Sequence, residues 1–237
     1  MRLGILQTGT APDQLKERFG DFPAMLCNLV GPGFETTTYD VVQGAPPPSV
    51  DACEAYVITG SPAGVYEDLP WIAPLIEFLR EAKGRARLVG ICFGHQILAK
   101  AFGGEVIKSP KGWGVGLHRY GVEARGPWMD QAEGVRIACS HQDQVVRLPP
   151  GCKVSLTSAF TPYAGLAYDD GRAISFQGHP EFDPDFAKAL IEARRGTRYT
   201  DEQADAAIAS LAGPNDRERV AEWIRGFLLG EGHGRPH

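Results

Sequence analysis

One cysteine stands between two glycines where an expected strand turns directly into an expected helix. Residues 90–94 read Gly-Ile-Cys-Phe-Gly. Gly-x-Cys-x-Gly is the thiol form of a nucleophile elbow, in which glycines leave room for a sharp turn. Such a turn points the sulfur outward at a helix N-terminus, where the partial positive charge favours thiolate. We therefore predict that Cys92 is an exposed nucleophile; the competing interpretation is a buried cysteine beside closely packed glycines. The cysteines without such flanks, which we expect to be packing residues, are Cys27, Cys53, Cys139 and Cys152.

A histidine and a glutamate follow the last expected strand. Residues 176–182 read Phe-Gln-Gly-His-Pro-Glu-Phe. His179 and Glu181 are two positions apart, so an extended segment points both side chains to the same side. Imidazole can carry a proton between a thiol and a leaving amine, and a carboxylate fixes the imidazole tautomer. Cys92, His179 and Glu181 therefore form a predicted triad for acyl transfer.

These two motifs together resemble the class I, triad-type glutamine amidotransferases. The resemblance spans roughly residues 50–190. Residues 58–68 (Ile-Thr-Gly-Ser-Pro-Ala-Gly-Val-Tyr-Glu-Asp), 112–116 (Gly-Trp-Gly-Val-Gly) and 140–143 (Ser-His-Gln-Asp) resemble the stand-alone, GMP-synthase-like subgroup. The resemblance implies an open α/β sheet, with Cys92 as nucleophile, His179 as base and Glu181 as its orienting carboxylate.

Attack on an amide carbonyl creates an oxyanion, which needs preorganised hydrogen-bond donors. The backbone amide of Phe93, at the start of the helix, is the natural first donor. The resemblance places the second donor in the loop after strand 55–59, where the family usually reads Gly-Gly-Pro and this chain has Gly60-Ser61-Pro62. Alignment on the proline makes Ser61 the donor and alignment on the first glycine makes it Gly60. We favour Ser61 and keep both.

The resemblance also implies how glutamine is bound. Gln96 would contact the α-amino or carboxylate end of glutamine, and backbone groups around Ser140, Gln142 and Asp143 would hold its other side. An equally weighted interpretation is that His141 and Asp143 order this loop. Cys92-x-x-His95 lacks a second pair of ligands, so we expect no metal site. No cofactor is expected either.

The elements that must position these residues alternate between strands and helices in the first half of the chain. There the sequence predicts strands at 2–7, 36–42, 55–60 and 87–92, and helices at 23–30 and 70–83 (with Pro70 at its first position). A third helix should follow the strand at 87–92 at once and run through 96–102. The sequence then predicts strands at 104–108, 115–123, 135–139, 153–157, 164–168 and 173–177, some of them antiparallel, and helices at 183–195, 201–211 and 216–229.

This order predicts an α/β fold with an open, mostly parallel sheet flanked by helices. The strands at 55–59, 87–91 and 173–177 should end at one edge of a shared pocket, because chemistry-bearing turns follow all three. We expect a single domain over residues 1–229 and a frayed tail over 230–237.

Composition excludes several function classes. The net charge is −5, from 24 Lys and Arg against 29 Asp and Glu, and no basic stripe is present, so nucleic acid is not an expected partner. No apolar run approaches the roughly 18 residues of a membrane span. Five cysteines without paired spacing suggest reduced thiols and a cytoplasmic enzyme. No phosphate-binding loop of the P-loop or pyrophosphatase type is present. Either the ammonia released here is used elsewhere, by a separate synthetase partner, or the substrate is not free glutamine.

Three functions therefore remain open. The first is hydrolysis of glutamine to glutamate and ammonia. The second is a γ-glutamyl peptidase, because γ-glutamyl peptides and conjugates present the same glutamyl half to Cys92. The third is a partner-binding module with a vestigial triad, and the intact Cys92, His179 and Glu181 count against it.

Overall fold

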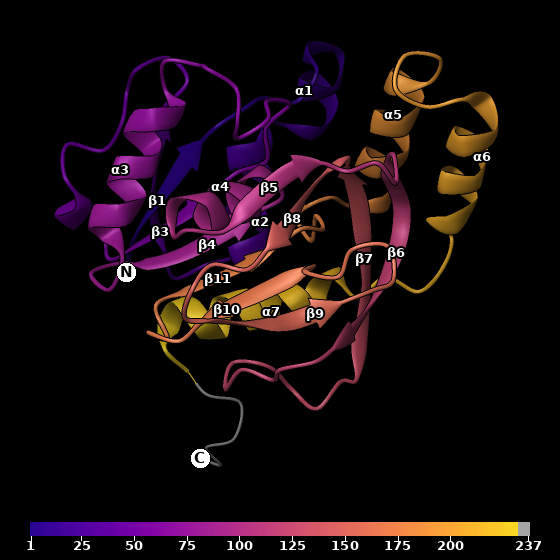
Figure 1. The fold of residues 1–237 in the computed structure, drawn as a ribbon. Helices are drawn as coiled ribbons and strands as arrows, with labels where there is room; N and C mark the ends of the chain where they lie inside the picture. The colour runs from indigo at the N-terminus through magenta and orange to yellow at the C-terminus, as the bar shows by residue number, and fades with distance from the viewer. Residues whose placement is uncertain (232–237) are drawn as a thin grey trace.

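The computed structural model describes residues 1–231, and its centre is a nine-stranded sheet of order β2-β1-β3-β4-β11-β10-β9-β6-β7 (Figure 1). The parallel part comprises β2 (Glu35–Asp40), β1 (Arg2–Gln7), β3 (Ala55–Ile58), β4 (Arg87–Ile91) and β11 (Ala173–Phe176). The antiparallel part continues through β10 (Gly165–Tyr168), β9 (Cys152–Thr157), β6 (Gly114–Val122) and β7 (Gly134–His141). The predicted open α/β fold is confirmed.

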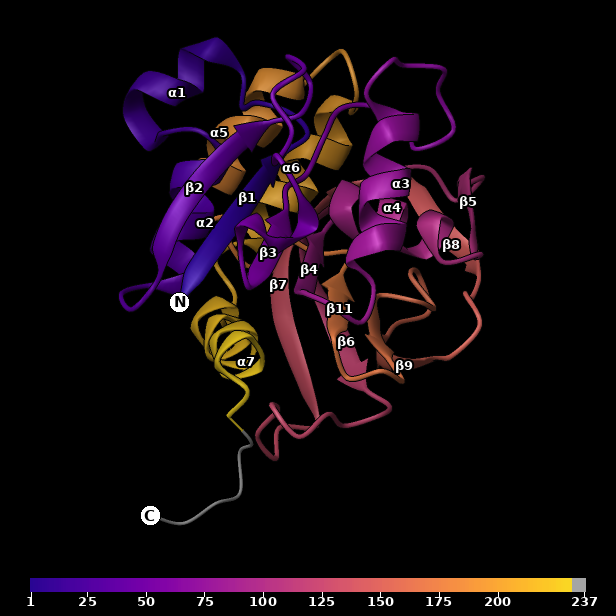
Figure 2. The ribbon, with the colours of Figure 1, turned by 90° about the vertical axis from the view of Figure 1, so that its left-hand side faces the viewer.

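Helices cover both faces of the parallel strands, with α3 (Ile72–Ala82) and α4 (Phe93–Ala101) opposite α2 (Phe22–Val30) and α7 (Arg217–Leu229) (Figure 2). The residues of strand β3 show why helices cover both faces. Its residues Tyr56 and Ile58 pack into the core with α3 and α4, whereas Ala55 and Val57 pack into the core with α2 and α7. All four are at most 1% exposed. A strand buried on both faces must be apolar throughout, as this one is.

A third apolar cluster joins α1 (Asp13–Phe19), α5 (Pro184–Arg194) and α6 (Asp201–Ser210). The start of α5 is fixed by Asp183, whose side chain accepts from the amide of Phe186 at 2.8 Å. The start of α6 is fixed by a capping box between Thr200 and Gln203. These two caps fix the residues at which α5 and α6 begin. The segment that joins the two helices borders the candidate active site.

Several local predictions need correction. The amide of Ile72 donates to Leu69 at 3.0 Å, so Pro70 lies in a separate turn and α3 begins two residues later than predicted. Helix α4 does begin at Phe93, directly after Cys92, as expected. The sequence did not predict α1, nor β8 (Asp143–Arg147), which pairs with β5 (Glu105–Lys108) in a separate small sheet.

The end of the described chain is a helix cap. Gly230 adopts a left-handed conformation after α7, and the amide of Glu231 donates to Gly226 at 2.8 Å. The rest of the predicted tail, residues 232–237, lies outside the described residues. None of the helices within residues 1–231 is long and apolar enough to cross a lipid bilayer.

The first prediction concerns the contact between α4 and β3. A Cβ on Gly94 would overlap the carbonyl oxygen of Ile58. We expect Gly94→Ala to lower the free energy of unfolding by about 1–3 kcal/mol, because the two backbones must separate. Urea denaturation measures the effect. The matched control is Gly121→Ala, whose Cβ would lie 4.0 Å from the carbonyl oxygen of Thr157. Equal stability of the two variants would contradict the prediction.

Candidate active site

Cys92 occupies a strained turn between β4 and α4. Its φ is 54° and its ψ is −98°, and it is the one non-glycine residue of positive φ within residues 1–231. A Cβ on Gly90 would overlap the carbonyl oxygen of Gly94, and one on Gly94 would overlap that of Ile58. The predicted elbow and the need for both glycines are therefore present in the backbone. Strain of this kind persists only where the surroundings hold it.

The prediction of an exposed sulfur is wrong. Cys92 is only 6% exposed. It lies at the bottom of a cleft whose walls come from the loop after β3 and from α5, including Pro62, Leu190 and Arg194. These elements are distant in sequence from the elbow, so the local pattern could not reveal them.

His179 and Glu181 form a buried pair at the carboxyl end of β11. His179 Nδ1 lies 2.7 Å from Glu181 Oε1, and both residues are 4% exposed. The imidazole stacks on Phe182, with ring centroids 4.0 Å apart and planes 7° apart. Its backbone amide donates to Ala138 at 2.8 Å. With Nδ1 held by the carboxylate, Nε2 is left to exchange a proton with the thiol.

The charges around His179 favour imidazolium. Burial alone would lower the pKa of His179, but the Glu181 carboxylate and the Cys92 thiol outweigh it, so the pKa is raised. Gly60 lies between the two reactive residues. A Cβ on Gly60 would be 3.2 Å from His179 Cε1 and 3.8 Å from Cys92 Cβ. Absence of a side chain at Gly60 thus lets the imidazole and thiol share one small space.

The loop after β3 presents one peptide to this space in a fixed orientation. The carbonyl oxygen of Gly60 accepts from the hydroxyls of Thr59 (3.0 Å) and Thr8 (3.2 Å). Both threonines are 1% exposed, and their hydroxyl oxygens are 2.9 Å apart. A trans peptide points its N–H opposite to its C=O, so this clamp directs the amide of Ser61 away from the threonines.

Three backbone amides near Cys92 are available to a substrate. Those of Gly60, Ser61 and Phe93 have no hydrogen-bond acceptor within residues 1–231, whereas that of Gly94 donates to Thr59 at 3.2 Å. The Phe93 side chain is 1% exposed and packs against Trp71, with ring centroids 5.4 Å apart. Its predicted role therefore rests on its backbone alone. Because the amides of Gly60 and Ser61 both lack an acceptor, the choice between them as the second donor stays a prediction.

The predicted substrate-binding residues converge on one cavity of about 290 Å³. The residues of the prediction that line it are Ser61, Cys92, Gln96, Ser140, Gln142 and Asp143. A smaller adjoining cavity is lined by Gly60, Ser61, Cys92, Ser140 and His179. The carboxyl ends of β3, β4 and β11 thus meet at one site, as predicted.

Gln96 is largely committed to the protein. Its side-chain nitrogen donates to the carbonyl of Asp143 at 2.9 Å and to Gln177 Oε1 at 3.2 Å. Gln177 in turn donates to Cys92 Sγ at 3.7 Å. His141 Nδ1 also lies 3.0 Å from the carbonyl oxygen of Asp143, so the loop-ordering interpretation has direct support. Contact of Gln96 with substrate stays a prediction.

Several cavity residues were not predicted from the sequence. They are Tyr66, Glu67, Lys108, Trp113, Arg194 and Arg198. Arg194 ends α5 and Arg198 follows it by four positions, a spacing typical of a solvated helix face. No local motif marks either arginine, because their place depends on how α5 packs.

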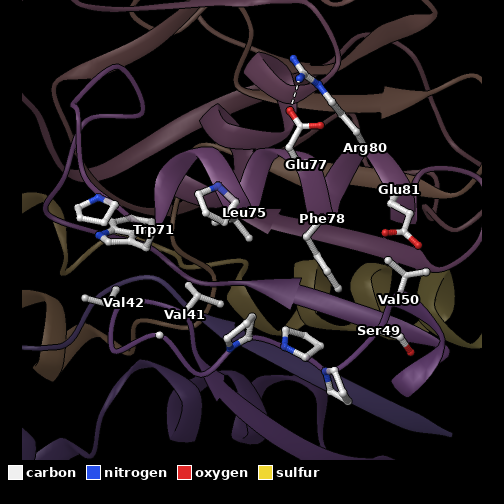
Figure 3. A pocket seen from close by; sticks show the side chains of 16 residues that line it. Val41, Val42, Ser49, Val50, Trp71, Leu75, Glu77, Phe78, Arg80 and Glu81 are labelled. Atoms are coloured by element: carbon white, nitrogen blue, oxygen red, sulfur yellow. Dashed lines mark hydrogen bonds and ion pairs between the residues drawn. The ribbon is translucent and has the colours of Figure 1, made fainter.

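A larger cavity of about 950 Å³ lies between residues 41–50 and α3 (Figure 3). It is lined mainly by prolines and by apolar side chains such as Val50, Leu75 and Phe78, with the Glu77–Arg80 ion pair at its edge. No cysteine or histidine lines it, and it shares no lining residue with the cavity at Cys92. The reactive groups therefore do not lie in this larger cavity.

Metal ligation finds no support in the part of the chain that the structure describes. No group of three His, Cys, Asp or Glu side chains within residues 1–231 is arranged to hold a metal ion. His95 is 0% exposed, and its Nδ1 lies 2.8 Å from Ser175 Oγ. Burial lowers the pKa of His95 to about 3, so this imidazole is a neutral core group. All five cysteines are unpaired thiols.

Comparison with known proteins gives a consistent result. A family model described as "Glutamine amidotransferase class-I" matches residues 34–194. A glutamine amidotransferase-like protein of Schizosaccharomyces pombe is 32% identical, covering 96% of this chain and 98% of its own. Gamma-glutamyl peptidase 4 of Arabidopsis thaliana is 28% identical, covering 75% of this chain and 74% of its own. A crystal structure of a Thermotoga maritima glutamine amidotransferase superposes with a TM-score of 0.77 at 19% identity, covering 97% of each chain.

The geometry of the His179–Glu181 pair predicts an unusual titration. We expect His179 in the intact protein to titrate above its ordinary value of 6.5. Glu181→Gln keeps the size and an acceptor oxygen but removes the negative charge that favours the cation, so it should lower this pKa. NMR titration of the imidazole carbons measures both values. An unchanged His179 pKa in Glu181→Gln would contradict the prediction.

Proposed function

Because this chain belongs to the class I glutamine amidotransferase family, we propose that it hydrolyses γ-glutamyl amide bonds through a thioester on Cys92. The observation that carries the proposal is the strained, buried thiol beside an imidazole that a buried carboxylate holds at 2.7 Å. A partner-binding module with a vestigial triad would have no need of such a turn, whose strain must be offset by its surroundings.

The proposed reaction has two halves. His179 Nε2 takes the proton of the Cys92 thiol as the sulfur attacks the γ-carbonyl carbon, and collapse of the tetrahedral intermediate breaks the C–N bond. His179 Nε2 delivers a proton to the departing nitrogen, and a glutamyl thioester remains on Cys92. Water then attacks the thioester, His179 accepts its proton, and glutamate leaves with restoration of the thiol. Glu181 keeps the imidazole oriented and stabilises imidazolium.

The oxyanion would be bound by the amides of Phe93 and Ser61. Both are available in the described structure, and both belong to segments held by other contacts. The first is fixed by the elbow and the second by the Thr8–Thr59 clamp. Donors that are already in place cost no reorganisation when negative charge develops.

Two leaving groups fit this chemistry. With glutamine the product is ammonia, and a separate synthetase would then consume it. With a γ-glutamyl peptide the product is a free amino acid or shortened peptide, and the similarity to gamma-glutamyl peptidase 4 favours this second substrate. Glutamate release from glutamine and from γ-glutamyl dipeptides distinguishes them. The unpaired thiols support our placing of the enzyme in a reducing cytoplasm.

The nucleophile prediction is tested with Cys92→Ala and Cys92→Ser. Both should lose more than about 10³-fold in glutamate release, because the nucleophile is removed. Their urea midpoints should stay near that of the unmodified chain, since each change is small. Turnover by Cys92→Ala at the unmodified rate would refute the thioester mechanism.

The threonine clamp generates a separate prediction. Thr59→Val retains the branched shape but loses the hydroxyl that donates to Gly60, so kcat should fall by up to about 10²-fold with a smaller change in KM. Thr59→Ser keeps the hydroxyl and should retain most activity. Alkylation of Cys92 by iodoacetamide, which forms no oxyanion, should proceed alike in both variants. A loss confined to KM, or an equal loss in Thr59→Ser, would disprove the role.

A further inference from the structure

Two arginines in the catalytic cleft lack a carboxylate partner. Arg194 and Arg198 both line the cavity that contains Cys92. Within residues 1–231, no Asp or Glu oxygen lies within ion-pair distance of either one. The intervening Arg195 is the opposite case, because it forms ion pairs of 2.8–3.5 Å with Glu192, Asp201 and Asp205. The chain thus neutralises the arginine outside the cavity and leaves the two inside it without a counter-charge.

Neutral groups hold the two guanidinium groups in place. Arg194 Nη1 donates to Ser140 Oγ at 2.8 Å. The guanidinium of Arg198 lies over the ring of Trp113 at 5.2 Å, and that ring meets Tyr199 edge to face at 5.5 Å. Burial and then the neighbouring Arg194 lower the pKa of Arg198, yet a guanidinium stays charged at neutral pH. Two positive charges held together in a cleft are a ready site for an anion.

The two cavities indicate which end of a substrate this anion belongs to. Arg194 lines both the cavity of about 290 Å³ at Cys92 and the smaller adjoining cavity that His179 lines. The leaving nitrogen must be near His179 to receive its proton, so Arg194 is on the leaving-group side. Arg198 lines only the cavity of about 290 Å³, and it is grouped with Arg194 because the Arg194 charge acts on it. Glu67 and Asp143, in the same cavity, supply carboxylates that suit the α-ammonium of the glutamyl half. Lys108 also lines this cavity, but its charge acts on the Asp143 carboxylate, so it has a counter-charge that Arg194 and Arg198 lack.

We propose that Arg194 and Arg198 bind the carboxylate of an amino-acid leaving group. The preferred substrates would then be γ-glutamyl peptides whose second residue has a free carboxylate, and glutamine would be a poorer substrate. This proposal rests on the proposed function and adds the substrate class. The bond that breaks is the same γ-carbonyl C–N bond. The freed nitrogen takes its proton from His179 and leaves as part of an amino acid whose carboxylate is held by the guanidinium groups.

The test compares γ-glutamyl-alanine with γ-glutamyl-alanine amide, which differ only in the charge of the leaving group. We expect kcat/KM of the unmodified chain to be about 10-fold or more higher for the free acid, as a charge-assisted hydrogen bond would give. In Arg194→Met and Arg198→Met the ratio of acid to amide should fall toward one. Arg195→Met is the matched control and should keep the original ratio. Arg198→Met alone decides the matter if Arg194→Met does not fold.

Calorimetry on Cys92→Ser repeats the comparison without turnover. Tighter binding of the free acid than of the amide, lost in the double variant Cys92→Ser/Arg198→Met, supports the proposal. An equal loss for acid and amide in both arginine variants overturns it, because the arginines would then serve the glutamyl half or the fold. If the acid binds preferentially but no γ-glutamyl amide is hydrolysed, the proposed function fails while the carboxylate site stands.

Discussion

The close approach of the β4–α4 turn to β3 is the constraint on which the rest of the site depends. Cys92 reaches its strained conformation only because Gly90 and Gly94 have no side chains to collide with the turn and with Ile58. The same approach brings the loop after β3 beside the start of α4. The positions of the thiol and of the Ser61 and Phe93 amides near it therefore result from one packing contact between backbones. A larger residue at either glycine would alter nucleophile and oxyanion site together.

Two separate sets of charged side chains lie in the cleft, and each set serves a different part of the proposed reaction. Glu181 is buried, and its second oxygen has no hydrogen-bond partner within residues 1–231, so its charge acts mainly on His179. Its influence raises the pKa of His179, which suits the proposed transfer of a proton to the leaving nitrogen. The guanidinium groups of Arg194 and Arg198 contact neutral side chains. Their positive charge is therefore available to the proposed carboxylate of the leaving group. Burial strengthens the interaction between Glu181 and His179, because water does not screen it.

A feature of the fold or of the site could be predicted from the sequence where residues close together in the chain determine it. The elbow at Cys92 and the His179–Glu181 pair are local, so residue type and spacing were sufficient to place them. The parallel strands were also predictable, because burial on both faces leaves an apolar run such as 55–58. The burial of Cys92 and the position of Arg194 beside it depend on how α5 packs over the sheet. That packing joins residues about a hundred positions apart, and no pattern within either segment records it.

Helix α4 links the nucleophile to the loop that faces it. The helix begins directly after Cys92, and one of its later residues, Lys100, donates to the carbonyl of Val65 at 2.8 Å. Glu67 closes the same loop by accepting from the amide of Gly64 at 2.6 Å. These two bonds tie the helix that begins beside the thiol to the loop that contains the Ser61 amide. Such ties suit the proposed mechanism, in which thiol, oxyanion donors and leaving-group charges must align at one carbonyl carbon.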